Sequence, residues 1–358
     1  MTQTDAAEAR GDAASALELM GRRPLGPDGK PFWRPWRIRH LAQLVAMEEL
    51  LPRWVTSRWI LAQAMQTLQE SSRKRALRSL EIAIEVRGGE QTLRGVDSVD
   101  ARAKVVDRDW VYRQVYLYEL GGLNDFLRSV ASPDLVAGAD RIQDWARAAM
   151  GGYRLLGHRP DAVTWECLAT GVRLVAPNIG SAVLVVPGEC VIGRLVPVDR
   201  GSMFETAPLL VPEHVAEQVA HEPTTWLGVV TAAQQDGAEI ATSGTHFGLL
   251  NDVPPVIWLH ALLENHRGAK PPAVAELAVA ALDTARRELA GSAPVRGASD
   301  VDVWPCLSAA LLEPGVTEAL VGVLTPDREE MLLRLSDLLA EPAASLCRTL
   351  AKNFGEAA

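Results

Sequence analysis

The sequence lacks the glycine-rich loops that bind nucleotide phosphates. Its 28 glycines include no pair separated by a single residue, so no Gly-x-Gly occurs. This absence excludes the dinucleotide-binding fingerprint and the glycine loop of protein kinases, because both require that spacing. No Gly-Lys-Ser or Gly-Lys-Thr occurs either, which excludes a Walker-type phosphate loop. We therefore expect no cofactor.

Cysteines and long apolar runs are also scarce. The four cysteines lie far apart and form no Cys-x-x-Cys, which excludes zinc-ribbon and thioredoxin-like spacings. No apolar run approaches the roughly 18 residues that a membrane-spanning helix needs. Asp5, Glu8 and Asp12 occupy the region where a secretory signal would carry basic and then apolar residues. We expect a soluble, cytoplasmic protein without a membrane partner.

Charge is unevenly distributed along the chain, which has a net charge of −9. Residues 31–88 contain ten Lys or Arg against five Glu, whereas residues 213–358 contain nine basic against twenty acidic residues. Such asymmetry fits a basic partner-binding face on an acidic body. It fits equally well an attraction between the two ends of one chain, and the sequence leaves both interpretations open.

The pattern of apolar residues predicts an α+β fold that is predominantly helical with a small central β-barrel-like module. Residues 1–30 are rich in Ala, Asp, Glu and Gly, and we expect a flexible tail there. Residues 31–150 repeat apolar positions at three- and four-residue steps, which indicates an N-terminal helical domain. Residues 151–212 contain short β-type runs separated by turns, and residues 213–358 are helical again.

Clustered cations in the N-terminal part of the chain suggest a surface that binds an acidic partner. A predicted helix from about Ser72 to Val86 carries four of them, and two more lie beside Trp33 and Trp36. Phosphates attract such cations, and exposed indoles can stack on unpaired bases. The alternative is a solvated helical face that binds nothing. The candidate binding residues are Arg37, Arg39, Arg73, Lys74, Arg75 and Arg78.

Another group of residues has the side-chain types that catalysis or metal binding requires. His260 and Glu264 are four apart in a predicted helix, so they share a face and could ligate one metal. His246 and Asp252 precede that helix and could add a ligand or activate a neighbouring hydroxyl group. His260 and Glu264 also fit an exposed polar pair. We expect no metal, and we keep these four residues as the alternative site.

The sequence thus favours a non-enzymatic binding or regulatory protein whose basic helical face contacts an acidic partner, either nucleic acid or protein. The alternative is a hydrolase or metalloenzyme centred on His246, Asp252, His260 and Glu264. Substrate, ligand and oligomeric state do not follow from the sequence.

Overall fold

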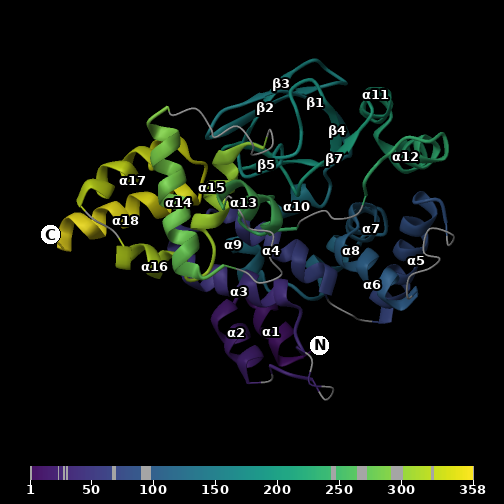
Figure 1. Ribbon diagram of the computed structural model, residues 1–358. Coiled ribbons are helices and arrows are strands. Elements are labelled where there is room, and N and C mark those ends of the chain that lie inside the picture. The colour runs from purple at the N-terminus through teal and green to yellow at the C-terminus, as the bar shows by residue number, and fades with distance from the viewer. Residues whose placement is uncertain are drawn as a thin grey trace.

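The computed structural model describes the chain except for residues 1, 23, 27–28, 30, 67–69, 90–97, 243–246, 264–271, 292–300, 324–325 and 358. The fold is mixed α+β, with helices around a small antiparallel sheet (Figure 1). None of the described helices combines the length and the apolar character of a membrane span.

The first helical part begins with two short helices and continues to the start of the sheet. Local capping signals explain several of its boundaries. Asp109 accepts a hydrogen bond from the Tyr112 amide, and Ser132 accepts one from the Leu135 amide ahead of a helix that starts with Pro133. The elements are α1 (Gln3–Ala9), α2 (Ala13–Gly21), α3 (Pro35–Met47), η1 (Glu48–Leu50), α4 (Arg53–Gln66), α5 (Glu70–Val86), α6 (Ser98–Arg108), α7 (Trp110–Gln114), the π-helix η3 (Val115–Glu119), α8 (Gly122–Ser129), α9 (Pro133–Gly138) and α10 (Ile142–Trp145).

The N-terminal segment, for which we expected a flexible tail, forms the helices α1 and α2. Thr2 and Asp5 form a reciprocal capping box at the start of α1, and Asp12 caps α2. Ala7, Ala16 and other small or apolar side chains of this segment belong to the main apolar core. Small side chains bury little area individually, which made the segment look unable to fold. They also allow close packing of helices, which is how α1 and α2 are held.

The sheet lies at the top of Figure 1. Its strands lie within residues 151–212, the part of the sequence for which β structure was predicted. Five antiparallel strands pair in the order β3-β2-β1-β4-β7, and β5 pairs with β6 in a separate hairpin. The sheet is not closed, because β3 and β7 remain as its edges, so the barrel-like part of the prediction is not confirmed. The strands are β1 (Gly151–His158), β2 (Ala162–Cys167), β3 (Arg173–Pro177), β4 (Cys190–Gly193), β5 (Leu195–Val198), β6 (Gly201–Phe204) and β7 (Leu209–Val211).

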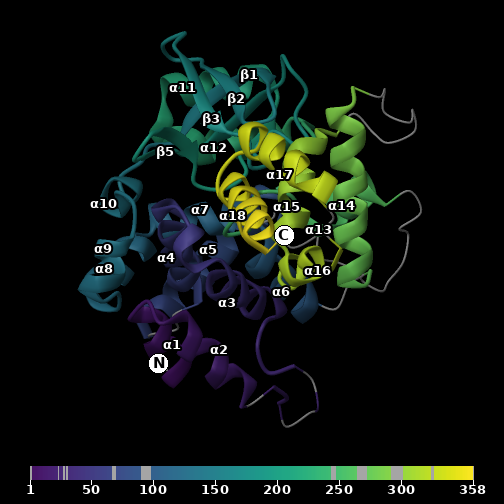
Figure 2. The same cartoon turned by 90° about the vertical axis from the view of Figure 1, so that its left-hand side faces the viewer.

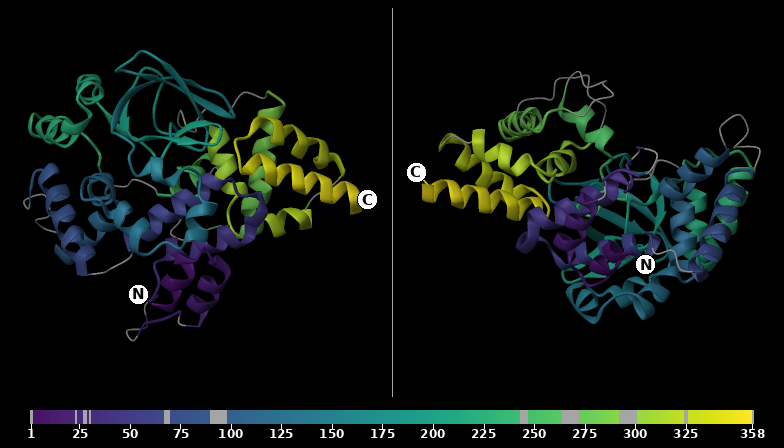
Figure 3. Two further views of the ribbon diagram at one scale, coloured as in Figure 1. Left: turned by 180° about the vertical axis from the view of Figure 1, so that it is seen from behind. Right: turned by 90° about the horizontal axis from the view of Figure 1, so that it is seen from below.

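Helix α11 (Glu213–His221) covers β1 and β4 from one side. It approaches so closely that a Cβ atom at Gly152 would lie 1.9 Å from the carbonyl oxygen of Ala216, so only glycine fits in this position of β1. The remaining elements follow this helix, and the last ones pack at the side of the molecule opposite α5 (Figures 1 and 3). Figure 2 views the molecule from the side of these last helices. The elements after the sheet are α11 (Glu213–His221), η4 (Pro223–Thr225), α12 (Trp226–Gln235), α13 (Pro255–Leu262), α14 (Val274–Leu289), α15 (Val303–Leu311), α16 (Val316–Val323), α17 (Pro326–Leu338) and α18 (Ala343–Ala357).

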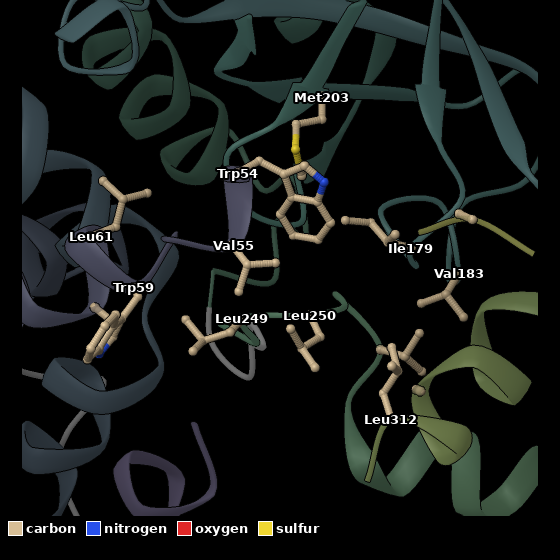
Figure 4. Close-up of a cluster of buried hydrophobic side chains, with 14 of the residues drawn as sticks. Trp54, Val55, Trp59, Leu61, Ile179, Val183, Met203, Leu249, Leu250 and Leu312 are labelled. Atoms are coloured by element: carbon tan, nitrogen blue, oxygen red, sulfur yellow. The ribbon is translucent and has the colours of Figure 1, made fainter. Parts of the chain in front are cut away.

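One apolar cluster extends through the helical part, the β module and the C-terminal helices. Figure 4 shows its centre, where Trp54 and Val55 of α4 lie near Met203 of β6 and near Leu250. Leu312, which follows α15, lies on the other side of the same group. Distant segments of the chain therefore share a common interior.

Charged side chains are buried where these segments meet. Arg58 of α4 donates to the Asp252 carboxylate at 3.0 Å and to the carbonyl of Phe204 at 3.0 Å. The side chains of Arg58 and Asp252 are 2% and 0% exposed. Arg113 of α7 pairs with Glu205 at 3.2 Å. A buried ion pair contributes little net stability, but a buried charge without its partner is costly.

We expect Arg58→Met to lower the free energy of unfolding by about 3–5 kcal/mol, because it leaves the Asp252 carboxylate buried without its guanidinium. Urea denaturation followed by circular dichroism measures the loss. Arg78→Met is the matched control, since the pair of Arg78 with Glu81 is exposed on both sides, and it should cost less than about 1 kcal/mol. The double variant Arg58→Met with Asp252→Leu should recover part of the loss. If Arg58→Met and Arg78→Met lowered the free energy of unfolding equally, the result would contradict the buried pair.

Candidate functional site

Two of the six predicted binding cations lie on α3, where they form ion pairs within the chain. Arg37 donates to Glu8 at 3.0 Å through Nε and to Asp5 at 2.7 Å, and it is buried. Its guanidinium also lies 5.2 Å from the ring centre of Trp33. Arg39 pairs with Glu313, in the loop after α15. These contacts attach α1 and the C-terminal part to α3.

The other four cations lie on α5 and have two kinds of surroundings. Arg75 donates to the carbonyl of Leu120 at 2.8 Å and pairs with Asp125, and its side chain is 11% exposed. Arg73, Lys74 and Arg78 lie on the exposed side of the helix. The structure therefore separates the six predicted residues, and three of them share an exposed face.

Of the four residues of the alternative catalytic or metal site, only Asp252 and His260 lie within the described part of the chain. His246 and Glu264 lie outside the described residues. Asp252 is inside the core, where burial raises the pKa of its carboxyl and the guanidinium of Arg58 opposes that rise. His260 lies on the exposed side of α13. Within the described part of the chain, no three His, Cys, Asp or Glu side chains are grouped to hold a metal ion.

A cavity of about 570 Å³ lies between α3, α4, α6 and the segment 247–256. That volume falls in the usual range of sites for small molecules, about 300–1,000 Å³. Pro254 and Pro255 start α13 at the edge of the cavity, and the ring of Phe247 lies 4.3 Å from the guanidinium of Arg113. The lining residues are Pro35, Trp36, Arg39, His40, Gln43, Ala62, Met65, Gln66, Val106, Asp107, Arg108, Arg113, Phe247, Gly248, Asn251, Pro254, Pro255 and Val256.

Most of the charges around this cavity are paired. Arg34 bonds Asp107 at 2.6 Å, Arg39 pairs with Glu313, and Arg113 pairs with Glu205. Burial raises the pKa of the Asp107 carboxyl, while Arg34 and Arg108 oppose that rise.

Arg108 is the exception. It is exposed, and it forms no ion pair with a carboxylate of the described chain. Three arginines, at positions 39, 108 and 113, and one carboxylate, Asp107, line the cavity. When their ion-pair partners outside the lining (Arg34, Glu205 and Glu313) are included, four arginines balance three carboxylates, which leaves an excess of one positive charge.

Sequence reasoning identified only one lining residue, Arg39, as a candidate. The other walls come from segments far apart in the chain, so no local motif marks them. The pair Pro254-Pro255 and the indole of Trp36 are the local features that point to this region. The chain matches no family model, no curated protein and no solved structure.

The surroundings of Arg37 predict a structural effect for its substitution. Arg37→Gln removes the guanidinium from Glu8, which is buried, so we expect unfolding to become easier by about 3 kcal/mol. Amide hydrogen exchange in residues 3–9 should become faster, because α1 loses its attachment to α3. Arg22→Gln, in an exposed pair with Glu18, should change stability by less than about 0.5 kcal/mol. Unchanged exchange in α1 would show that Arg37 does not hold this helix.

Proposed function

We propose that this protein binds a small, mainly apolar ligand with one negative charge in the cavity between α3, α4, α6 and the segment 247–256. The observation behind the proposal is the combination of an apolar lining with a single excess positive charge. The protein would thus be a non-enzymatic binding or regulatory protein whose acidic partner is a small molecule.

Apolar contact would supply most of the affinity. Ten of the eighteen lining residues are apolar or glycine, and they include the indole of Trp36 and the ring of Phe247. Burying about 200 Å² of apolar ligand surface is worth about 5 kcal/mol at about 25 cal/mol per Å². Lost translational and rotational freedom offsets much of that gain, so a ligand of drug-like size is needed.

The charge balance selects among anions. A nucleoside triphosphate carries several negative charges and would require several cations that are not already paired. Around this cavity only Arg108 meets that condition among the described residues. Opposite charges 4 Å apart near a protein surface attract by about 4 kcal/mol, which suffices to orient a single carboxylate. A monocarboxylate with an aromatic or aliphatic body fits best.

Two pairs of variants test the cavity, with titration calorimetry of octanoate and benzoate as the measurement. Val106→Trp should fill the cavity and weaken binding by more than about tenfold, whereas Val99→Trp, on the same helix but outside the lining, should not. Arg108→Gln should weaken binding by about tenfold, and Lys104→Gln should serve as its neutral control. Octanamide should bind more weakly than octanoate.

Either of two results would contradict the cavity proposal. One is that no monocarboxylate binds the wild-type protein at millimolar concentration. The other is that Val106→Trp binds octanoate as tightly as Val99→Trp does.

We propose a second function for the exposed face of α5, namely contact with an acidic macromolecule. Leu77 is 62% exposed on this face, between Lys74 and Arg78, which lie three and one residues away. An exposed leucine with flanking cations is a common composition for a docking surface, because apolar contact and charge attraction act together.

We expect Lys74→Glu with Arg78→Glu to weaken binding of a fluorescein-labelled oligodeoxythymidylate by at least about tenfold at low salt, as measured by anisotropy. Arg75 is left unchanged, because replacing it would break its pair with Asp125 and destabilise the fold. Arg22→Glu with Arg147→Glu alters the same number of exposed arginine or lysine charges elsewhere and should have little effect. A polyglutamate peptide in place of the oligonucleotide distinguishes a protein partner. If the Lys74→Glu, Arg78→Glu variant and its control bound the oligonucleotide equally well, the result would contradict this second function.

A further inference from the structure

Two of the amide side chains that line the cavity beside α3 are almost fully buried. Gln43 of α3 is 4% exposed, and Asn251, in the segment before α13, is 6% exposed. Burying an amide group costs free energy unless its donor and acceptor atoms are hydrogen-bonded. The hydrogen bonds of these two side chains therefore show which of their atoms remain available to a ligand.

Backbone groups determine the orientation of both amides. Gln43 donates through Nε2 to the carbonyl of Leu312 at 3.2 Å. Asn251 accepts a hydrogen bond from the Val253 amide through Oδ1 at 3.1 Å. A carbonyl only accepts and a backbone N–H only donates, so neither side-chain amide can exchange its oxygen and nitrogen without losing its bond. The acceptor of Gln43 and the donor of Asn251 are the atoms that remain.

These remaining atoms face the cavity. Neither Oε1 of Gln43 nor Nδ2 of Asn251 has a hydrogen-bond partner among the residues that the structure describes. Neither atom is fully enclosed by protein, whereas Oε1 of Gln66, a third amide of the lining, is enclosed. Because Gln43 and Asn251 line the cavity and are otherwise buried, the open space beside these two atoms is the cavity.

One acceptor and one donor thus border the same largely apolar space. They belong to two walls, α3 and the segment 247–256. Their supports lie in one region, because Leu312 and Leu250, which precedes Asn251, belong to the same buried group (Figure 4). A ligand with an entirely apolar body displaces water from both amides and leaves them without partners, which lowers its affinity. The body of a well-matched ligand therefore carries a donor and an acceptor of its own.

We propose that the ligand is an N-acyl amino acid, an inference that rests on the function proposed for the cavity. Its amide N–H donates to Oε1 of Gln43, and its amide carbonyl accepts from Nδ2 of Asn251. A trans amide directs these two groups to opposite sides, which suits partners on two walls. N-acylation also removes the positive charge of the amino group. The molecule then has one negative charge, which matches the single excess positive charge at the cavity.

Calorimetric titration with three ligands of equal length tests the proposal. N-benzoylglycine contains the amide, 4-phenylbutanoate has methylene groups in place of the carbonyl and the N–H, and 4-oxo-4-phenylbutanoate retains the carbonyl alone. We expect N-benzoylglycine to bind about tenfold more tightly than 4-phenylbutanoate, with the ketone between them, because only the amide satisfies both side chains.

The ligand series distinguishes the failure of this inference from the failure of the cavity function. If N-benzoylglycine bound no more tightly than 4-phenylbutanoate, the amide assignment would be wrong, although the cavity would still bind a monocarboxylate. If none of the three ligands bound at millimolar concentration, the amide assignment and the cavity function would both be wrong.

Variants of the two amides test their roles directly. The quantity to compare is the ratio of the dissociation constants of 4-phenylbutanoate and N-benzoylglycine, because damage to the fold weakens the binding of both ligands. Gln43→Met and Asn251→Leu should each lower this ratio from about ten to about three or less. Gln234→Met is the matched control, since Gln234 donates to the carbonyl of Ile240 at 2.6 Å but lies outside the lining. A ratio that stayed the same in Gln43→Met and Asn251→Leu as in this control would overturn the proposal.

Discussion

Buried guanidinium groups constrain how the parts of this fold can be assembled. Removing a charge from water costs several kcal/mol unless a partner and further hydrogen bonds compensate. Each buried arginine finds its partner in a distant segment: Arg58 of α4 meets Asp252, and Arg113 of α7 meets Glu205. We infer that these pairs select one arrangement of the parts. The pair of Arg58 with Asp252 also holds the segment 247–252, which forms one wall of the cavity, against α4.

Local signals were sufficient to predict the type and position of many elements. The cap at Ser132 and the short β-type runs after residue 151 could be recognised because capping and strand alternation involve neighbours in the sequence. Closure of the sheet could not be predicted in this way, because it depends on whether the two edge strands meet in space. The packing of α1 and α2 into the core could not be predicted, because the burial of Ala7 depends on the surface that α3 and α4 provide.

The positions of the predicted binding cations in the structure show what charge counts along a sequence cannot predict. The uneven distribution fitted either a basic partner-binding face or an attraction between distant parts of the chain. The structure contains a long-range ion pair of the second kind, and it also leaves some cations exposed. Arg39 pairs with Glu313, 274 residues away, whereas Lys74 on α5 is exposed. No pattern in the sequence distinguishes these two residues, because a long-range ion pair has no spacing rule. The cavity could not be predicted for the same reason, since its walls come from segments that are far apart in the chain.

The acidic character of the whole molecule bears on how anions would bind to it. A net charge of −9 repels anions at long range, so attraction must come from cations close to the bound group. Surface charges are screened over about 8 Å at physiological ionic strength, whereas partly buried charges are screened much less. Salt should therefore weaken contacts on the exposed face of α5 more than the binding that we propose for the cavity, because the proposed affinity comes mainly from apolar contact with residues such as Trp36 and Phe247. The salt dependence of an observed interaction consequently indicates which of these surfaces carries it.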